Sequence, residues 1–115
     1  MATKAEVRLR ALRELGIVQV NQAAPPHHDS EMKDSYDEVY AAIKEQGLAT
    51  WTSTAAIPDE VTPHVVALVA INRADTYGIS NERFQRLAGK AAGAMVGIRS
   101  LVNPPFESLD SPKDY

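Results

Sequence analysis

The sequence predicts an all-α protein: a single, four-helix bundle-like domain over residues 1–102 and an extended C-terminal tail over residues 103–115. Apolar residues recur every three to four positions along several segments, which is the spacing of a helix face. Most of these segments begin at a residue that caps helices and end near glycine or proline. A chain of 115 residues can bury one core, since a domain of this size hides roughly two-thirds of its unfolded surface.

The first helix is predicted over residues 4–15. Thr3 and Glu6 have the spacing of a capping box, in which each side chain accepts a hydrogen bond from the other residue's backbone N–H. Gly16 follows the last apolar position and can adopt the left-handed conformation that ends helices. The apolar face consists of Ala5, Leu9, Leu12 and Leu15.

The second helix is predicted over residues 30–46, after a loop over residues 21–29 that contains two consecutive prolines. Asp29 or Ser30 can cap its start, and Gly47 can end it. Its apolar residues form the clearest amphipathic pattern in the chain. They are Met32, Tyr36, Val39, Tyr40 and Ile43.

The third predicted helix, over residues 63–77, is apolar on nearly every side. Thr62 can cap it, and Pro63 fits its first turn because an amide there has no partner within the helix. Such a helix must be the central post of a bundle or be enclosed by neighbouring subunits. Residues 48–56, rich in small and β-branched side chains around Trp51, are expected to form an extended crossover between the second and third helices.

The fourth predicted helix, over residues 81–101, starts at a cap formed by Ser80 or Asn81 and is stopped by a pair of prolines. Gly89, Gly93 and Gly97 share one face of it at a strict spacing of four. Each glycine costs up to about 1 kcal/mol relative to alanine inside a helix, so close backbone approach is the natural compensation. The face then packs against the third helix or against a neighbouring subunit.

Composition and charge limit the function classes. The chain has no cysteine, which excludes disulfides and thiolate metal sites and favours an intracellular origin. No stretch resembles a signal peptide, and no apolar run is long enough to cross a bilayer, so neither export nor a membrane partner is expected. The net charge of −3 and the scattered cations argue against a nucleic-acid groove.

Charges are distributed unevenly among the predicted helices. The first and fourth are basic and the second is acidic, while the third is mildly acidic. This pattern fits solvated helix faces or, alternatively, complementary faces between copies of the protein.

Residues with chemical potential are few. His27, His28, Asp29 and Glu31 suggest a metal site, but adjacent histidines in a loop point in different directions, so an exposed polar loop is the better interpretation. His64 falls in the first turn of the third helix, where it can contact solvent. Nucleophile elbows, phosphate-binding glycine loops and H-E-x-x-H pairs do not occur. We therefore predict a protein that is not an enzyme, with no catalytic, cofactor-binding or metal-binding residues.

Two further features have open interpretations. Trp51 is a plug over one end of the core or, alternatively, an interface anchor. The tail has too few apolar residues for a core of its own, which predicts a disordered end. Its apolar residues are also spaced like the anchors of an extended recognition peptide. The residues predicted to bind a partner there are Pro104, Pro105, Phe106, Leu109 and Tyr115.

The order of these parts resembles the head-to-tail connector (adaptor) proteins of tailed bacteriophages, the helical proteins that form a ring beneath the portal. The resemblance rests on the opening residues 5–16, the acidic second helix and the phrase Ile-Pro-Asp-Glu-Val at residues 57–61. It continues through the apolar helix that ends Ala-Asp-Thr-Tyr-Gly at residues 74–78, and it includes a long fourth helix and the proline-containing tail at residues 103–115.

The resemblance implies a structural virion protein of the head–tail neck, made in the cytoplasm of a bacterial host. It would form a ring of about twelve subunits, extend the portal channel, help retain packaged DNA and provide a platform for a downstream tail or nozzle protein. DNA would pass without specific binding, and the C-terminal segment would clamp the portal. The main alternative is a small helical protein-interaction or regulatory module acting as a monomer or dimer. An enzyme subunit using His64 or Asp75 is a third.

Overall fold

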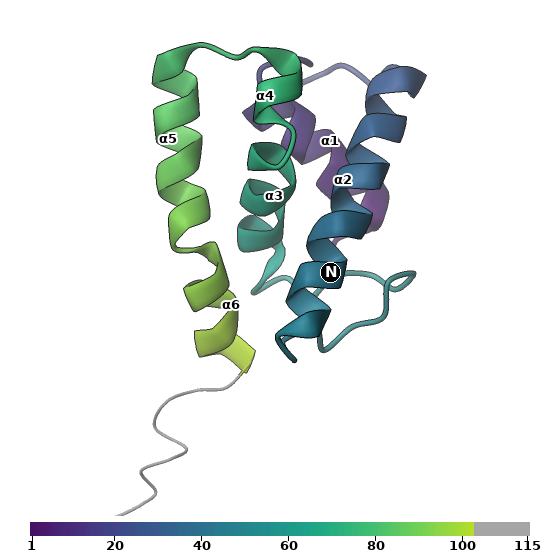
Figure 1. Ribbon diagram of the computed structural model, residues 1–115. Coiled ribbons are helices and arrows are strands. Elements are labelled where there is room, and N and C mark those ends of the chain that lie inside the picture. The colour runs from purple at the N-terminus through teal and green to yellow at the C-terminus, as the bar shows by residue number, and fades with distance from the viewer. Residues whose placement is uncertain (103–115) are drawn as a thin grey trace, which may run out of the picture.

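The computed structural model describes residues 1–102 and shows an all-α fold, as predicted (Figure 1). Its helices are α1 (Lys4–Glu14), α2 (Pro26–Glu45), α3 (Thr62–Ile71), α4 (Ala74–Tyr77), α5 (Asn81–Ala92) and α6 (Ala94–Val102). Within these residues the one extended pairing is an antiparallel bridge between Ala2 and Ile57, which ties the N-terminus to the end of the α2–α3 crossover. The predicted arm at residues 103–115 lies outside the described residues.

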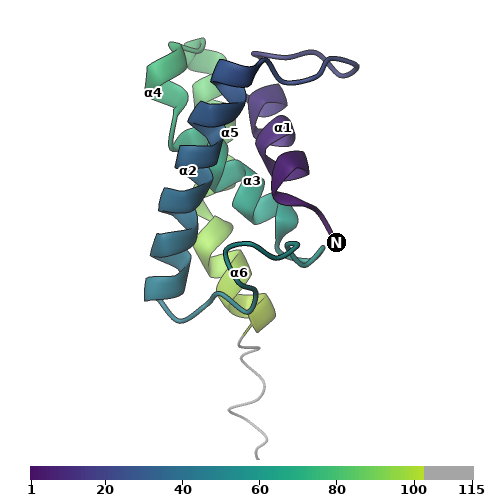
Figure 2. The same ribbon diagram turned by 90° about the vertical axis from the view of Figure 1, so that its right-hand side faces the viewer.

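Helix α3 is the central element of the bundle. Helices α1, α2, α5 and α6 all pack against it, and Figures 1 and 2 show them around it. Val65, Val69 and Ala70 are fully buried because each side of α3 faces another helix. The prediction of a central post is confirmed, and the chain's own helices provide the cover.

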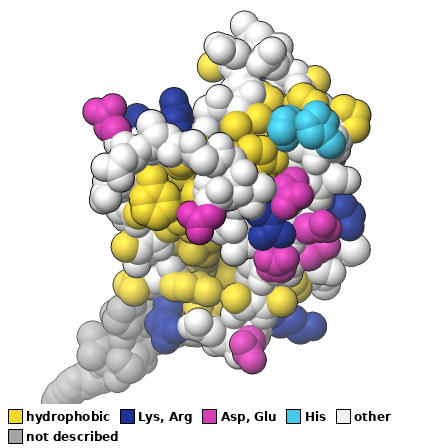
Figure 3. All heavy atoms as spheres, turned by 45° about the horizontal axis from the view of Figure 1, so that its top comes forward, with side chains coloured by type: hydrophobic (Ala, Val, Ile, Leu, Met, Phe, Trp, Pro, Cys, Tyr) yellow, Lys and Arg dark blue, Asp and Glu magenta, His cyan; other side chains and the backbone are white. Residues whose placement is uncertain are grey.

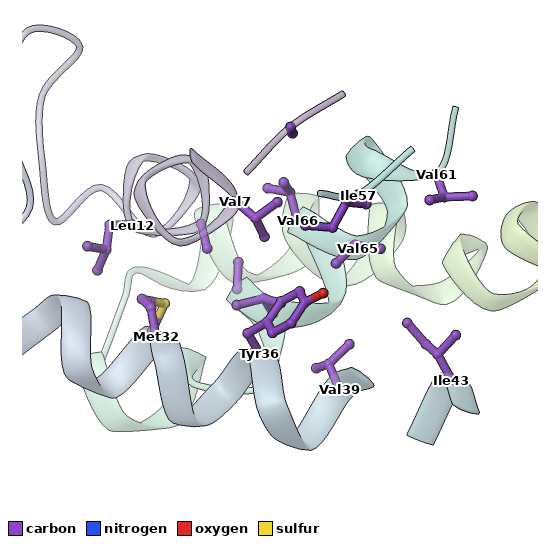
Figure 4. Close-up of a cluster of buried hydrophobic side chains, with 14 of the residues drawn as sticks. Val7, Leu12, Met32, Tyr36, Val39, Ile43, Ile57, Val61, Val65 and Val66 are labelled. Carbon is purple, nitrogen blue, oxygen red and sulfur yellow. The ribbon is translucent and has the colours of Figure 1, made fainter. Parts of the chain in front are cut away.

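The core is built from one face of α1 and the predicted apolar face of α2, whose side chains point toward one another and toward α3 in Figure 4. Its largest fully buried members include Leu12, Met32, Tyr36, Ile43, Leu48 and Ile57. The face predicted for the first helix is partly wrong: Leu12 and Leu15 are buried, but Ala5 is exposed and Leu9 is half-buried. Val7 and Ala11 are the fully buried residues that the prediction missed.

Both ends of α1 have the predicted features, a capping box at the start and a left-handed glycine after the end. The backbone N–H of Thr3 donates to the Glu6 carboxylate at 2.8 Å, and that of Glu6 donates to the Thr3 hydroxyl at 3.1 Å. These two bonds form the predicted capping box and satisfy amides that the helix leaves free. Gly16 has φ 77°, the left-handed conformation expected after the helix.

The predicted start of the second helix is wrong by four residues. Pro25 occupies the cap position and Pro26 the first position of α2, while the amides of His28 and Asp29 donate to the Pro25 carbonyl. A proline in the first turn loses no intrahelical hydrogen bond, so the two prolines begin the helix instead of marking a loop.

The third and fourth predicted helices are each divided in two. A break at residues 72–73 separates α3 from α4, and Gly93 separates α5 from α6. Glycine is the weakest helix former after proline, so a helix that contains three glycines is expected to break at one of them. Thr62 is not a cap: its hydroxyl donates to the Pro58 carbonyl at 2.8 Å, and Val61 holds the cap position. Of the two predicted caps of α5, Ser80 is the one in place, and Asn81 is the first residue of the helix.

Trp51 is a plug and not an exposed anchor. The residue is only 6% exposed, and its indole N–H donates to the Tyr36 hydroxyl at 3.0 Å. The Tyr40 hydroxyl donates to the Trp51 carbonyl at 2.6 Å. These bonds fix the crossover against α2, so the interpretation as an interface anchor is wrong for the folded subunit.

Candidate functional site

The candidate site is an open groove between α1 and α5, with one face of α3 as its floor. Its volume is about 520 Å³. Arginine and lysine side chains of α1 and α5 form its rims, and the floor is mainly apolar. The lining residues are Arg10, Arg13, Glu14, Pro63, His64, Val66, Ala67 and Lys90.

Positive charge gathers along this groove and the smaller depression next to it. Among the described residues that line the two hollows, Glu14 is the only carboxylate. The cations are Arg10, Arg13, Arg83, Arg86 and Lys90. The prediction that the cations are scattered is wrong for these five, because α1 and α5 both pack against α3 and so lie in neighbouring positions. The cations of α1 and those of α5 are about 70 positions apart in sequence, so no local sequence pattern indicates that they lie close together.

Glu14 links the two rims. Its carboxylate pairs with the Lys90 ammonium at 2.9 Å, and its backbone carbonyl accepts a bond from the Arg83 guanidinium at 3.1 Å. The Arg13 guanidinium donates to the Val20 carbonyl at 2.7 Å, while its buried Nε has no partner among the described residues. One carboxylate cannot neutralise five cations, so the groove favours an anionic ligand.

Of the three glycines on one face of the fourth predicted helix, only Gly97 packs closely against another helix. A Cβ at Gly97 would lie 2.6 Å from His64 Nε2, so close packing against the third helix is confirmed there. Gly89 and Gly93 have no atom within 4 Å of such a Cβ, so packing within the chain is wrong for these two. His64 therefore contacts α6 instead of only solvent.

The acidic helix α2 lies on the other side of α3 from α5 (Figure 1). Several of its carboxylates pair within the chain: Glu31 and Glu38 with Arg73, at 2.8 and 2.9 Å, and Asp29 with Arg8 at 2.8 Å. Figure 3 shows acidic side chains gathered around a few basic ones on one side of the visible face. Part of the charge complementarity noted in the sequence is thus used inside the subunit.

Hydrogen bonds from Arg73 and Asn72 lower the pKa of Glu38 to about 2, from an ordinary value of 4.5. The folded protein then binds fewer protons than the unfolded chain as pH falls from 5 toward 2, so this carboxylate stabilises the fold above pH 5 and loses its effect below it. We expect the urea midpoint to fall less between pH 5 and 3 in Glu38→Gln than in the wild type. Glu45→Gln, an exposed position of the same helix, is the matched control and should retain the wild-type slope; equal slopes in all three proteins would contradict this assignment.

His27 and His28 lie in the first turn of α2 and not in a loop. His28 Nδ1 lies 3.1 Å from the Tyr77 hydroxyl, which joins α2 to α4. Within residues 1–102 no group of three potential ligands is arranged for a metal ion. His28 therefore joins α2 to α4, while His27 is exposed.

None of the helices in the described part of the chain is both long and apolar enough to cross a membrane.

No protein-family model, curated protein or solved structure matches the chain. The predicted arm residues Pro104, Pro105, Phe106, Leu109 and Tyr115 lie outside the described residues. The groove is therefore the feature of residues 1–102 with the most distinctive chemistry, and it was not predicted from the sequence.

Alanine at the glycine positions tests the contact between α6 and His64. We expect Gly89→Ala to raise the free energy of unfolding by about 0.5–1 kcal/mol, because alanine favours the helix and its methyl group meets nothing. Gly97→Ala should gain less, since the His64 ring must move. Urea denaturation measures both, and a His64→Ala background should remove the difference. Equal gains at both positions in the wild-type background would show that the ring imposes no constraint.

Proposed function

We propose that this protein is a structural subunit of the head-to-tail connector (adaptor) ring of a tailed bacteriophage. The ring would extend the portal channel, help retain packaged DNA and provide a platform for the tail or nozzle. The observation that carries the proposal from the structure is the presence of two unlike faces on one subunit: the cationic groove between α1 and α5, and the acidic helix α2 across α3.

Unlike faces on opposite sides of a subunit favour head-to-tail contacts between identical copies, and such contacts close into a ring when the rotation permits. Asp34 and Glu45 of α2 are exposed, so this side retains negative charge after the internal pairs are formed. The groove retains positive charge after Glu14 is paired. Repetition of one such contact would build a ring of about twelve subunits, the number that the family resemblance implies.

The charge balance is consistent with a channel through which DNA passes without specific binding. The net charge is −3, and five of the twelve lysines and arginines line the groove and the adjoining depression, where a neighbouring subunit would cover them. A mildly acidic assembly does not hold a polyanion tightly. In this account residues 103–115 form an arm that binds the portal or a neighbouring subunit, and the assembly is located in the neck of the virion.

Imaging of assembled particles tests this function. Co-expression with the portal protein encoded near this chain, followed by electron microscopy, should show a ring of this protein attached below the portal. A matched preparation that lacks this chain should show the portal alone. Portals without added density, in the presence of folded and abundant protein, would contradict the proposal.

A second function has one observation in its favour. Val65, Val69 and Ala70 of α3 are fully buried by helices of their own chain, so the folded subunit does not need neighbours to bury this part of its core. A small interaction module that acts as a monomer or dimer would use the same groove for an acidic partner. The mass of the particle in solution separates the two functions.

A further inference from the structure

We propose that the groove between α1 and α5 binds residues 103–115 of a second copy of this chain. The inference rests on the proposed ring and specifies what fills the groove: residues 103–115 of the adjacent subunit, and not its helix α2. It follows from the chemistry of the groove, the composition of this segment and the place where α6 ends.

The charges of the two partners are complementary. Five arginines and lysines line the groove and the adjoining depression against a single carboxylate, that of Glu14. Residues 103–115 carry Glu107, Asp110 and Asp114 against Lys113. Opposite charges on two surfaces speed their encounter and select the partner. The cationic groove thus matches a segment of the chain that has a local excess of carboxylates.

The apolar residues of the groove and of residues 103–115 are also complementary. Pro63, Val66 and Ala67 form a floor beneath the charged rims. The segment carries Phe106, Leu109 and Tyr115, and aromatic side chains supply much of the binding energy where they enter a pocket. A volume of about 520 Å³ lies within the range of roughly 300–1,000 Å³ in which proteins enclose ligands of a few rings.

Geometry favours a second copy over the same chain. Helix α6 ends at Val102, twelve residues beyond Lys90, so the segment begins roughly 18 Å past that rim of the groove, at about 1.5 Å per helical residue. Binding in its own subunit requires the chain to reverse directly after α6. The segment starts Asn-Pro-Pro, and prolines favour extended backbone for themselves and for the residue before them. Thirteen extended residues span about 43 Å, enough to reach an adjacent subunit.

Photocrosslinking in the full chain tests the inference. A photoreactive benzoylphenylalanine replaces Phe106, and one preparation is labelled with ¹⁵N while another is unlabelled. The two are mixed at high salt, returned to low salt and irradiated, and the crosslinked peptides are identified by mass spectrometry. We expect crosslinks from position 106 to peptides of α1, α3 or α5 that line the groove, with pairs that join labelled to unlabelled chains.

Charge reversal provides the specificity control. Arg10→Glu with Arg86→Glu should reduce the yield of these crosslinks about tenfold or more, because two attractive contacts become repulsive. Lys44→Glu with Lys33→Glu, two exposed positions on α2, makes the same change in net charge away from the groove and should retain the yield. Far-UV circular dichroism confirms that all variants remain helical.

Three outcomes would overturn the inference. The first is that position 106 crosslinks to the groove only within chains of the same label, although the oligomers contain both labels. That result would place residues 103–115 in the groove of their own subunit. Crosslinks that avoid the groove would assign this segment another partner surface. If the groove variant and the α2 variant lost crosslinking yield equally, the loss would be due to the change in net charge and not to the groove. Rings seen by native mass spectrometry together with any of these results would leave the proposed function intact, whereas monomers in every preparation would refute the ring itself.

Discussion

Tyr36→Ala should lower the free energy of unfolding by about 3–5 kcal/mol, the largest loss of stability that we expect from a single substitution. The Tyr36 side chain is fully buried between α1, α2 and α3, and its hydroxyl accepts the indole N–H of Trp51 at 3.0 Å. Alanine removes the ring, leaves a cavity and deprives the indole N–H of its partner. Because domains are stable by only about 5–15 kcal/mol, much of that margin would be lost.

Chemical denaturation followed by circular dichroism measures this loss. Two milder variants divide it into parts: Tyr36→Phe keeps the ring and removes the hydroxyl, at an expected cost of about 1–3 kcal/mol. Tyr40→Phe removes the bond to the Trp51 carbonyl and should cost about 1 kcal/mol. If Tyr36→Ala unfolded at the wild-type denaturant concentration, the buried position of this ring in the core would be refuted.

Deletion of residues 103–115 should abolish assembly of the ring, and with it attachment to the portal, and leave the helical fold intact. The described helices and their buried core are formed by residues 1–102, so we expect them to form without the deleted segment. The segment cannot offset the cost of ordering its backbone, about 1–2 kcal/mol per residue, without a surface that buries Phe106, Leu109 and Tyr115. Its removal therefore acts on assembly and not on folding.

Thermal denaturation and a portal-binding assay separate these two effects. The truncated chain should keep its unfolding midpoint and helical content while binding of portal falls to background. A full-length variant with Phe106, Leu109 and Tyr115 changed to serine is the matched control, and it should fail in the same way. Heads that bind the truncated protein and retain their DNA would refute the role of the arm.

Local sequence signals predicted the elements that depend on local chemistry. The Thr3–Glu6 capping box, the Gly16 stop and the Ser80 cap involve residues within a few positions of one another, so their hydrogen bonds could be inferred from spacing. The central position of α3 was equally predictable, since an apolar circumference has to be covered on all sides.

The failures have physical reasons too. Pro25 and Pro26 fit both a loop and a helix start, and the contacts that accompany the helix, from His28 to Tyr77 and from Asp29 to Arg8, join residues that are distant in sequence. Glycine spacing indicated a close contact without showing which glycine makes it, and Gly97 alone meets His64. The cationic groove depends on two helices that are distant in sequence, so it required the tertiary structure.

The central claim is that the chain assembles into a ring, and native mass spectrometry of the purified full-length protein tests it most directly. A ring of twelve copies of the 12.5 kDa chain would have a mass of about 150 kDa, and raised salt should dissociate it because charged faces join its subunits. We predict a single dominant closed oligomer near this mass at low salt. A monomer or dimer across the whole range of salt and protein concentration would contradict the ring and favour the small interaction module.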